Sequence, residues 1–284
     1  RPGFVASTVS LRSSSVESIA VVEKKSGEVI GEVEYGRAFS TIHPGAIYMH
    51  FGASYEVEQL DLGAAQAVVR PFDDEWYTRP KMETEVFIDR VIERRRTAGV
   101  DLCFGEISVA DQVTGYQRIL NADQEAIDLI DLDLPEQEFQ TRGLWYTVPE
   151  QMTAQMPLNA LLGALHATEH SQIAVLPLIA MCDRWDIGGL STNVHPQTGM
   201  PSIFIYDGHP GGIGISRRGY DFFERLLADA LGLVDECSCE GGCPSCVQSP
   251  KCGNLNEPLF KAGAIGLMRA MQEALPREAS MPAQ

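Results

Sequence analysis

Five of the seven cysteines in this 284-residue chain fall within sixteen residues, from Cys237 to Cys252. They follow the pattern Cys-x-Cys-x3-Cys-x2-Cys-x5-Cys. Within it, the two-residue gap between Cys243 and Cys246 lets a single turn present two sulfurs to one ion. Zinc prefers four ligands in a tetrahedron, and thiolates are soft donors that suit it. The cluster therefore predicts a structural zinc site, and it requires this segment to fold around a metal ion.

The spacing favours one ligand set but leaves alternatives open. We predict four ligands: Cys239, Cys243, Cys246 and Cys252. Cys237 is an alternate for Cys239, because a Cys-x-Cys pair is strained when both sulfurs bind one ion. A redox-active Cys-x-x-Cys pair and an iron–sulfur cluster are the other interpretations. A secreted disulfide scaffold would distribute its cysteines along the chain, so the clustering favours a cytoplasmic protein.

The charge balance limits the partners of the chain. Lys and Arg number 22 and Asp and Glu number 39, which gives a net charge of −17. An acidic surface repels phosphate, so any contact with nucleic acid must be local or shared with other domains. No apolar run reaches the ~18–20 residues of a membrane span, and we expect no membrane association. The chain begins at Arg1 rather than Met, and we expect it to be part of a longer protein.

The hydrophobic pattern predicts an α+β protein with a β-rich first domain, residues 1–150. Short apolar runs separated by Gly-bearing turns are typical of a small barrel or sandwich. The run Val86–Arg96 fits either a strand or a short helix. The strands expected here are Val16–Val22, Glu28–Tyr35, Gly45–His50, Tyr55–Asp61, Ala64–Arg70, Val100–Val109 and Tyr116–Leu120.

The spacing of apolar residues changes in the second domain, residues 151–284. We expect this domain to be α/β and to carry the zinc loop. Leu158–Cys182 has apolar residues at helical spacing, with a break at Pro177. Ser202–Tyr206 is a short apolar strand. Two further helices are expected, at Tyr220–Leu231 before the cysteines and at Pro258–Ala274 after them.

Several motifs together resemble one family. The stretch Cys239–Asn254, CEGGCPSCVQSPKCGN, is similar to the C-terminal zinc-binding domain of the MrfA-like (mitomycin-repair-factor) group of superfamily 2 DEAD/DEAH-box DNA helicases. Cys182–Gly189, Ile205–Gly214 and His43–Tyr48 extend the resemblance, which covers roughly residues 5–273. It implies the zinc-binding region of a 3′ to 5′ ATP-dependent helicase that acts in DNA repair. The motor would lie upstream, since no G-x-x-x-x-G-K-[ST] phosphate loop occurs in the sequence.

A second motif points to a different class of protein. His166, Glu169 and His170 match the H-x-x-E-H pattern of some zinc proteases, and the spacing places all three near one face of a helix. A hydrolase would need a third ligand further along the chain, such as Glu224. The competing interpretation is a buried polar cluster on a core helix.

Basic residues suggest where nucleic acid would bind. Arg94, Arg95 and Arg96 form a basic run, and a guanidinium can donate two hydrogen bonds to one phosphate. The alternative is a solvated edge that pairs with Glu83, Glu85 and Glu93. Arg217 and Arg218 follow the Gly-rich turn 207–214, where a backbone phosphate contact competes with a tight packing turn. Trp76, Tyr77 and Trp145 offer stacking surfaces for single-stranded bases, or they belong to the core.

These observations combine into one functional expectation. The chain is the motor-free, zinc-binding C-terminal region of a DNA-repair helicase, which braces its own upstream motor domains and contacts single-stranded or forked DNA. A metal-dependent hydrolase and an acidic protein-interaction module are the alternatives. Asp183 and Asp186 suit a turn cap better than a magnesium site, because no third carboxylate lies nearby in the sequence.

Overall fold

The chain forms two compact units that interleave in sequence. The computed structural model describes residues 18–154 and 156–275, so the expected strand Val16–Val22 begins outside the described residues. Within these limits the first unit holds residues 18–83 and 111–137, and the second holds residues 84–110 and 138–275. This division differs from the expected boundary at residue 150, because the long strands β6 (Trp76–Thr97) and β7 (Val100–Leu120) each run through both units.

The first unit is built on a five-stranded sheet in the order β2-β1-β5-β4-β3. Strands β1 and β5 are parallel, and the other neighbours are antiparallel. Helix α1 packs on the sheet and contributes Ala38 to a core that includes Ile19, Val57 and Val69. The elements are β1 (Ser18–Glu23), β2 (Val29–Glu34), α1 (Tyr35–Thr41), β3 (Ile47–His50), β4 (Ala53–Asp61) and β5 (Gln66–Pro71).

The second sheet has the order β10-β11-β9-β7-β6, with β8 paired to β7. Strand β11 is buried along its whole length between β9 and β10. The molecule is rich in strands, has one sheet that is nearly closed into a barrel, and also contains helices. The expected α+β class with a β-rich first part is therefore confirmed. The further strands are β8 (Ala126–Asp131), β9 (Gln137–Thr147), β10 (Ile187–Thr192) and β11 (Ser202–Asp207).

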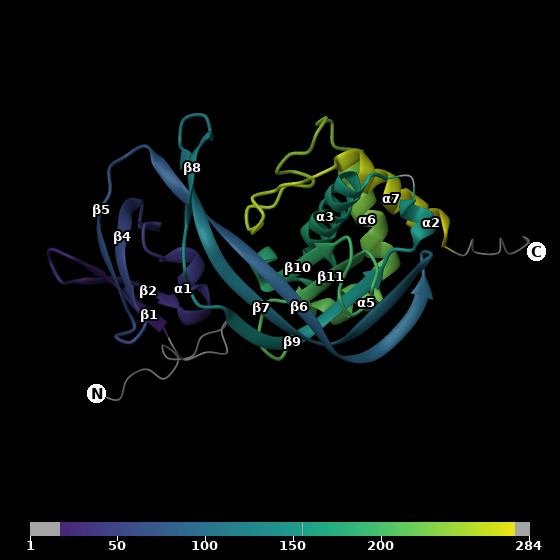
Figure 1. The fold of residues 1–284 in the computed structure, drawn as a ribbon, viewed down its shortest axis with the longest axis horizontal. Coiled ribbons are helices and arrows are strands. Elements are labelled where there is room, and N and C mark those ends of the chain that lie inside the picture. Colours follow the sequence, from purple (N-terminus) through teal and green to yellow (C-terminus); the bar gives the residue numbers. More distant parts are fainter. Residues whose placement is uncertain (1–17, 155, 276–284) are drawn as a thin grey trace, which may run out of the picture. The chain divides into compact units, whose positions relative to one another are not determined.

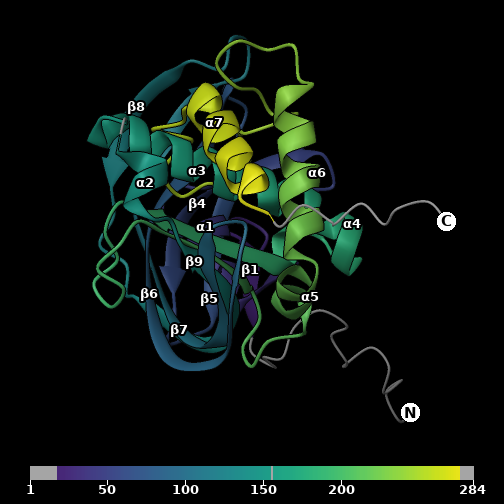
Figure 2. The same cartoon turned by 90° about the vertical axis from the view of Figure 1, so that its right-hand side faces the viewer.

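Helices of the second unit cover one face of this sheet, with α3, α6 and α7 packed against one another (Figures 1 and 2). Helix α3 is buried on nearly every side, as an apolar central helix must be. It ends at Val175, and α4 begins at Pro177 because proline cannot continue the hydrogen-bond ladder. The helices are α2 (Glu150–Thr153), α3 (Leu158–Val175), α4 (Pro177–Ala180), α5 (Ile215–Asp221), α6 (Phe223–Asp235) and α7 (Lys261–Glu273).

The structure resolves one open expectation from the sequence and corrects two others. Val86–Arg96 is a strand, since it lies inside β6. The expected pair Val100–Val109 and Tyr116–Leu120 is a single 21-residue strand, because Thr114-Gly115 continues the ladder with β8 instead of turning. The expected helix Tyr220–Leu231 is two helices that meet at Phe222.

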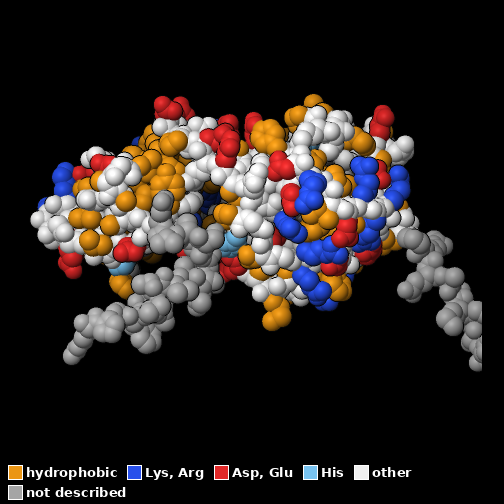
Figure 3. Space-filling view, turned by 90° about the horizontal axis from the view of Figure 1, so that it is seen from below, with side chains coloured by type: hydrophobic (Ala, Val, Ile, Leu, Met, Phe, Trp, Pro, Cys, Tyr) orange, Lys and Arg blue, Asp and Glu red, His pale blue; other side chains and the backbone are white. Residues whose placement is uncertain are grey.

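The surface carries both signs of charge. Lys and Arg side chains gather on one face of the second unit, on the right in Figure 3, where acidic side chains lie among them. Among the described residues, no helix combines the length and the apolar character needed to cross a membrane.

The central position of α3 gives a direct test of the core. Leu165 is fully buried on this helix, whereas Leu158 in its first turn is 69% exposed. We expect Leu165→Ala to lower the free energy of unfolding by about 2–5 kcal/mol, because it removes buried methyl groups and leaves a cavity. Leu158→Ala is the matched control and should change it by less than ~0.5 kcal/mol in urea denaturation. Equal effects of the two substitutions would contradict the central placement of α3.

Candidate metal centre and basic surface

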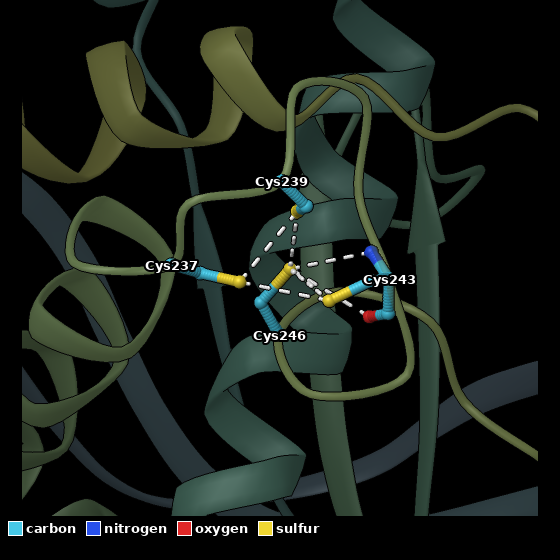
Figure 4. A group of neighbouring side chains, drawn as sticks. All are labelled: Cys237, Cys239, Cys243 and Cys246. Carbon is cyan, nitrogen blue, oxygen red and sulfur yellow. Dashed lines mark hydrogen bonds between the residues drawn. The ribbon is translucent and has the colours of Figure 1, made fainter.

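Four sulfurs meet in the segment between α6 and α7. They belong to Cys237, Cys239, Cys243 and Cys246, and Figure 4 shows them pointing toward a common centre. Cys237 Sγ lies 3.6 Å from Cys239 Sγ and 3.6 Å from Cys243 Sγ. Cys246 Sγ lies 3.5 Å from Cys239 Sγ and 3.7 Å from Cys243 Sγ. None of the seven cysteines, all of which are described, forms a disulfide.

These distances fit a tetrahedral metal ion. With zinc–sulfur bonds of ~2.3 Å, the edge of a tetrahedron of sulfurs is ~3.8 Å long. The four measured edges, 3.5–3.7 Å, are close to that length and far longer than the ~2.05 Å of a disulfide bond. The cluster therefore fits a zinc ion held by four thiolate ligands. Four thiolates would leave no ligand position open on such an ion, as in structural zinc sites.

A lysine supports the cluster from α7. Lys261 Nζ donates to the carbonyl oxygens of Cys237 and Cys239, at 2.6 Å each, and to Cys239 Sγ at 3.4 Å. Burial raises the pKa of the Cys239 thiol, but hydrogen bonds from the neighbouring thiols and from Lys261 outweigh burial and lower it to about 7. Lys261 thus favours the thiolate form that binds metal. The sequence analysis missed it, because a lysine nine residues after Cys252 carries no recognisable signal.

The structure gathers a different set of cysteines from the predicted one. Cys237 stands in the cluster, and Cys252 lies instead beside His166, with 3.3 Å between Cys252 Sγ and His166 Nε2. The Cys-x-Cys spacing does bring both sulfurs to the cluster, with 3.6 Å between Cys237 Sγ and Cys239 Sγ. After Cys246 the chain runs along α3, which carries Cys252 away from the four sulfurs. We accordingly propose Cys237, rather than Cys252, as the fourth ligand.

The H-x-x-E-H residues lie on α3, but the suggested third ligand does not join them. Glu224, on α6, accepts hydrogen bonds from Arg95 and from Thr97. Glu169 is fully buried, and burial raises the pKa of its carboxyl to about 7. The rings of His166 and His170 are neighbours, with 4.3 Å between centroids. The motif is thus one buried polar group on a core helix, and Glu224 belongs to an ion pair elsewhere.

Two of the five predicted phosphate-binding arginines hold elements of the second unit together. Arg95 on β6 pairs with Glu224 and donates to the carbonyl of Tyr220 at 2.8 Å. Arg217 on α5 pairs with Glu93 of β6, and also with Asp221 at 2.9 Å. These pairs join β6 to α5 and α6.

The other three arginines are exposed. Arg96 lies 3.8 Å from Asp101. Arg94 donates to Cys103 Sγ at 3.5 Å, and Arg218 stacks over the ring of Phe222 at 4.2 Å. Among the described residues, neither Arg94 nor Arg218 forms an ion pair with a carboxylate.

Strand β6 divides the basic run between two faces of its sheet. Side chains alternate along a strand, so Glu93 and Arg95 face α5 and α6, whereas Arg94 faces the other way. Arg94 contacts Cys103, which packs with Trp145 in a separate apolar cluster. The five arginines therefore do not form one continuous strip.

The Gly-rich turn already holds a carboxylate. The fully buried side chain of Asp207 accepts hydrogen bonds from the backbone N–H groups of Gly214, at 2.6 Å, and Ser216, also at 2.6 Å. Ile213 and Ile215 donate to the same carboxylate. Because Asp207 satisfies the donors that a phosphate would need, the turn packs helix against strand.

Two further expectations are resolved locally. Asp183 and Asp186 cap the short helical turn 184–186 through reciprocal hydrogen bonds, and Asp186 Oδ1 lies 3.0 Å from His209 Nε2. Trp145 is 2% exposed and belongs to the core, so it offers no stacking surface. Tyr77 donates a hydrogen bond to Gln124 at 2.7 Å.

Comparison with known proteins agrees with this site. Residues 168–247 match the model of the MrfA Zn-binding domain. The ATP-dependent helicase YprA of Bacillus subtilis is 32% identical over 250 residues, which cover 86% of this chain and 33% of YprA. The ATP-dependent helicase HRQ1 of Saccharomyces cerevisiae is 26% identical, over 90% of this chain and 25% of its own length.

A solved structure shows the same fold. The DUF1998 helicase MrfA, in a crystal structure with DNA, aligns with 95% of this chain at a TM-score of 0.63 and 29% identity, and the match covers 36% of MrfA. The chain thus spans about a quarter to a third of the length of the helicases that it resembles.

Removal of the ion tests the structural role of the four cysteines. Cys246 is 2% exposed, and we expect Cys246→Ser to reduce the bound zinc. The melting temperature should fall by roughly 10 °C, as expected for a loss of a few kcal/mol in a domain of this size. Cys182→Ser, outside the cluster, is the control and should melt like the unchanged chain. Unchanged melting of the parent chain after verified zinc removal would contradict a structural ion.

Proposed function

Because residues 168–247 match the model of the MrfA Zn-binding domain, we propose that the chain is the zinc-binding accessory region of an ATP-dependent DNA helicase. The sequence contains no phosphate-binding loop, so ATP hydrolysis belongs to motor domains elsewhere in that helicase. The motor moves 3′ to 5′ in this proposal and acts in DNA repair, as in the helicases that the sequence resembles.

One observation carries the proposal. The similarity to YprA covers 86% of this chain, so it includes both compact units and not the cysteine segment alone. A shared small zinc loop arises easily in unrelated proteins, but similarity along most of a two-unit chain does not. The match to the DNA-bound MrfA structure, over 95% of the chain, supports the same assignment.

In this proposal the zinc site stiffens a region that braces the motor. The 25 residues from Glu236 to Phe260 contain no helix or strand, and a segment of this length has little means of holding its own shape. Four thiolates and Lys261 fix it between α6 and α7. A rigid segment transmits force between a motor and a bound strand better than a flexible one does.

The DNA contact that we propose uses the exposed arginines. Arg94, Arg96 and Arg218 donate to phosphates of a single-stranded or forked substrate, while Arg95 and Arg217 keep β6, α5 and α6 in place. The exposure of Arg94 and Arg218, and their lack of an ion pair among the described residues, support this division of roles. Because the chain is acidic overall, the contact is local, and the motor domains contribute the rest of the binding energy.

Charge reversal tests the proposed DNA-binding arginines. We expect Arg94→Glu combined with Arg218→Glu to weaken binding to fluorescent single-stranded DNA several-fold at low salt. The slope of log K against log salt should become shallower by ~0.7 for each phosphate that the double variant no longer neutralises. Fluorescence anisotropy across a salt series measures both quantities.

Lys25→Glu is the control for charge reversal as such, because it makes the same change at one site, half that of the double variant, at an exposed turn of the first unit. It should leave the salt slope unchanged. Equal affinities of the double variant and the unchanged chain at every salt concentration would reject these arginines as phosphate ligands. If the unchanged chain bound no DNA but captured a basic protein, the acidic interaction module would be the better assignment.

A further inference from the structure

A second group of metal-binding side chains lies apart from the four thiolates. His166 and His170 are one turn apart on α3, and Cys252 comes from the segment before α7. One ligand atom from each of the three residues lies within 4.8 Å of the others. His166 is 5% exposed, His170 6% and Cys252 9%. We call this group the His–His–Cys cluster.

Hydrogen bonds fix which nitrogen each histidine offers. His166 Nδ1 lies 2.9 Å from the carbonyl oxygen of Pro258, and His170 Nδ1 lies 2.7 Å from that of Val247. A carbonyl oxygen only accepts, so both Nδ1 atoms carry the hydrogen and donate it. Each Nε2 atom then carries a lone pair, and that of His166 faces Cys252 Sγ at 3.3 Å. Metal-binding histidines are typically held in this way, with the second nitrogen donating to a backbone carbonyl.

The buried surroundings keep both imidazoles neutral. Burial lowers the pKa of His166, and burial together with the neighbouring His166 ring lowers the pKa of His170 to about 3. Neutral imidazole is the form that binds metal.

We propose that His166, His170 and Cys252 form a second metal site, separate from the four-cysteine site, that binds a zinc-like divalent cation through two imidazole nitrogens and one thiolate. On binding, the Cys252 thiol releases its proton to solvent, and each ligand donates an electron pair to the ion. Imidazole and thiolate together suit zinc among the abundant cations. Three protein ligands leave one tetrahedral position for a water molecule.

A hydrogen-bonded cluster without metal is the competing arrangement. In it, the Cys252 thiol donates to His166 Nε2 across their 3.3 Å separation. That single proton makes a hydrogen bond with one imidazole, that of His166, whereas a cation can bind the Nε2 atoms of both. The cation is therefore the arrangement that engages both imidazoles and the sulfur at once.

The site would attach the segment after the zinc loop to the central helix. Residues 248–260 contain no helix or strand, and their backbone meets α3 where Phe260 N donates to the carbonyl of Gly163 at 3.0 Å. An ion shared by Cys252 and two histidines of α3 anchors the middle of this segment. The two metal sites then fix successive parts of the same long connection.

Metal counting tests the proposal on the purified 284-residue chain. We expect two zinc ions per chain by inductively coupled plasma mass spectrometry. Cys252→Ser should retain one ion, and Cys182→Ser, a cysteine outside both clusters, should retain two. A single ion in the unchanged chain, together with the same count in Cys252→Ser, would overturn the second site.

A second measurement uses only the unsubstituted chain, so its result does not depend on whether a variant folds. Titration of the metal-free chain with Co²⁺ should show two spectroscopically distinct steps, because thiolate-to-metal charge transfer is stronger for four sulfurs than for one. Saturation at one equivalent with a four-thiolate spectrum alone would also overturn the proposal. Neither measurement involves DNA, so a negative result would leave the helicase assignment untouched.

Discussion

The attraction of four thiolates for one ion is the interaction on which the C-terminal part of the structure depends. The connection from α6 to α7 is 25 residues long and has no helix or strand to satisfy its backbone. Its two ends nevertheless leave and enter helices that pack on each other. The sulfurs of Cys237, Cys239, Cys243 and Cys246 replace the apolar core that so short a segment cannot build. Lys261, the first residue of α7, also stabilises the segment, because its ammonium group donates to the carbonyl oxygens of Cys237 and Cys239.

Helix α3 connects this metal-stabilised segment to the sheet. Its apolar residues fill the space beneath α6 and α7, and its polar residues are buried as well, so each needs a partner. His166 and His170 find carbonyls of the long connection, and Gln172 accepts from Tyr146 on β9 at 2.9 Å. Helix α3 therefore holds its neighbours by hydrogen bonds as well as by packing. These hydrogen bonds fix the position of the cysteine segment on the helix.

The acidic composition and the proposed DNA contact are compatible because the structure uses its arginines in two ways. Arg95 and Arg217 are engaged with carboxylates and join elements of the second unit. Arg94 and Arg218 form no ion pair with a carboxylate among the described residues. Reversal of Arg95 would therefore disturb the fold as well as any binding of phosphate, which makes Arg94 and Arg218 the informative positions.

The sequence by itself determined the features that depend on neighbours in the chain. The cysteine spacing indicated zinc, Pro177 marked the break after α3, and the short apolar runs indicated a β-rich first part. Tertiary structure alone decided that Cys252 lies with His166 rather than with the other sulfurs, that β6 and β7 run through both units, and that the basic run divides between two faces. Spacing fixes which groups can reach one another across a few residues, whereas contacts between distant segments depend on how helices and sheets pack, which no local pattern encodes.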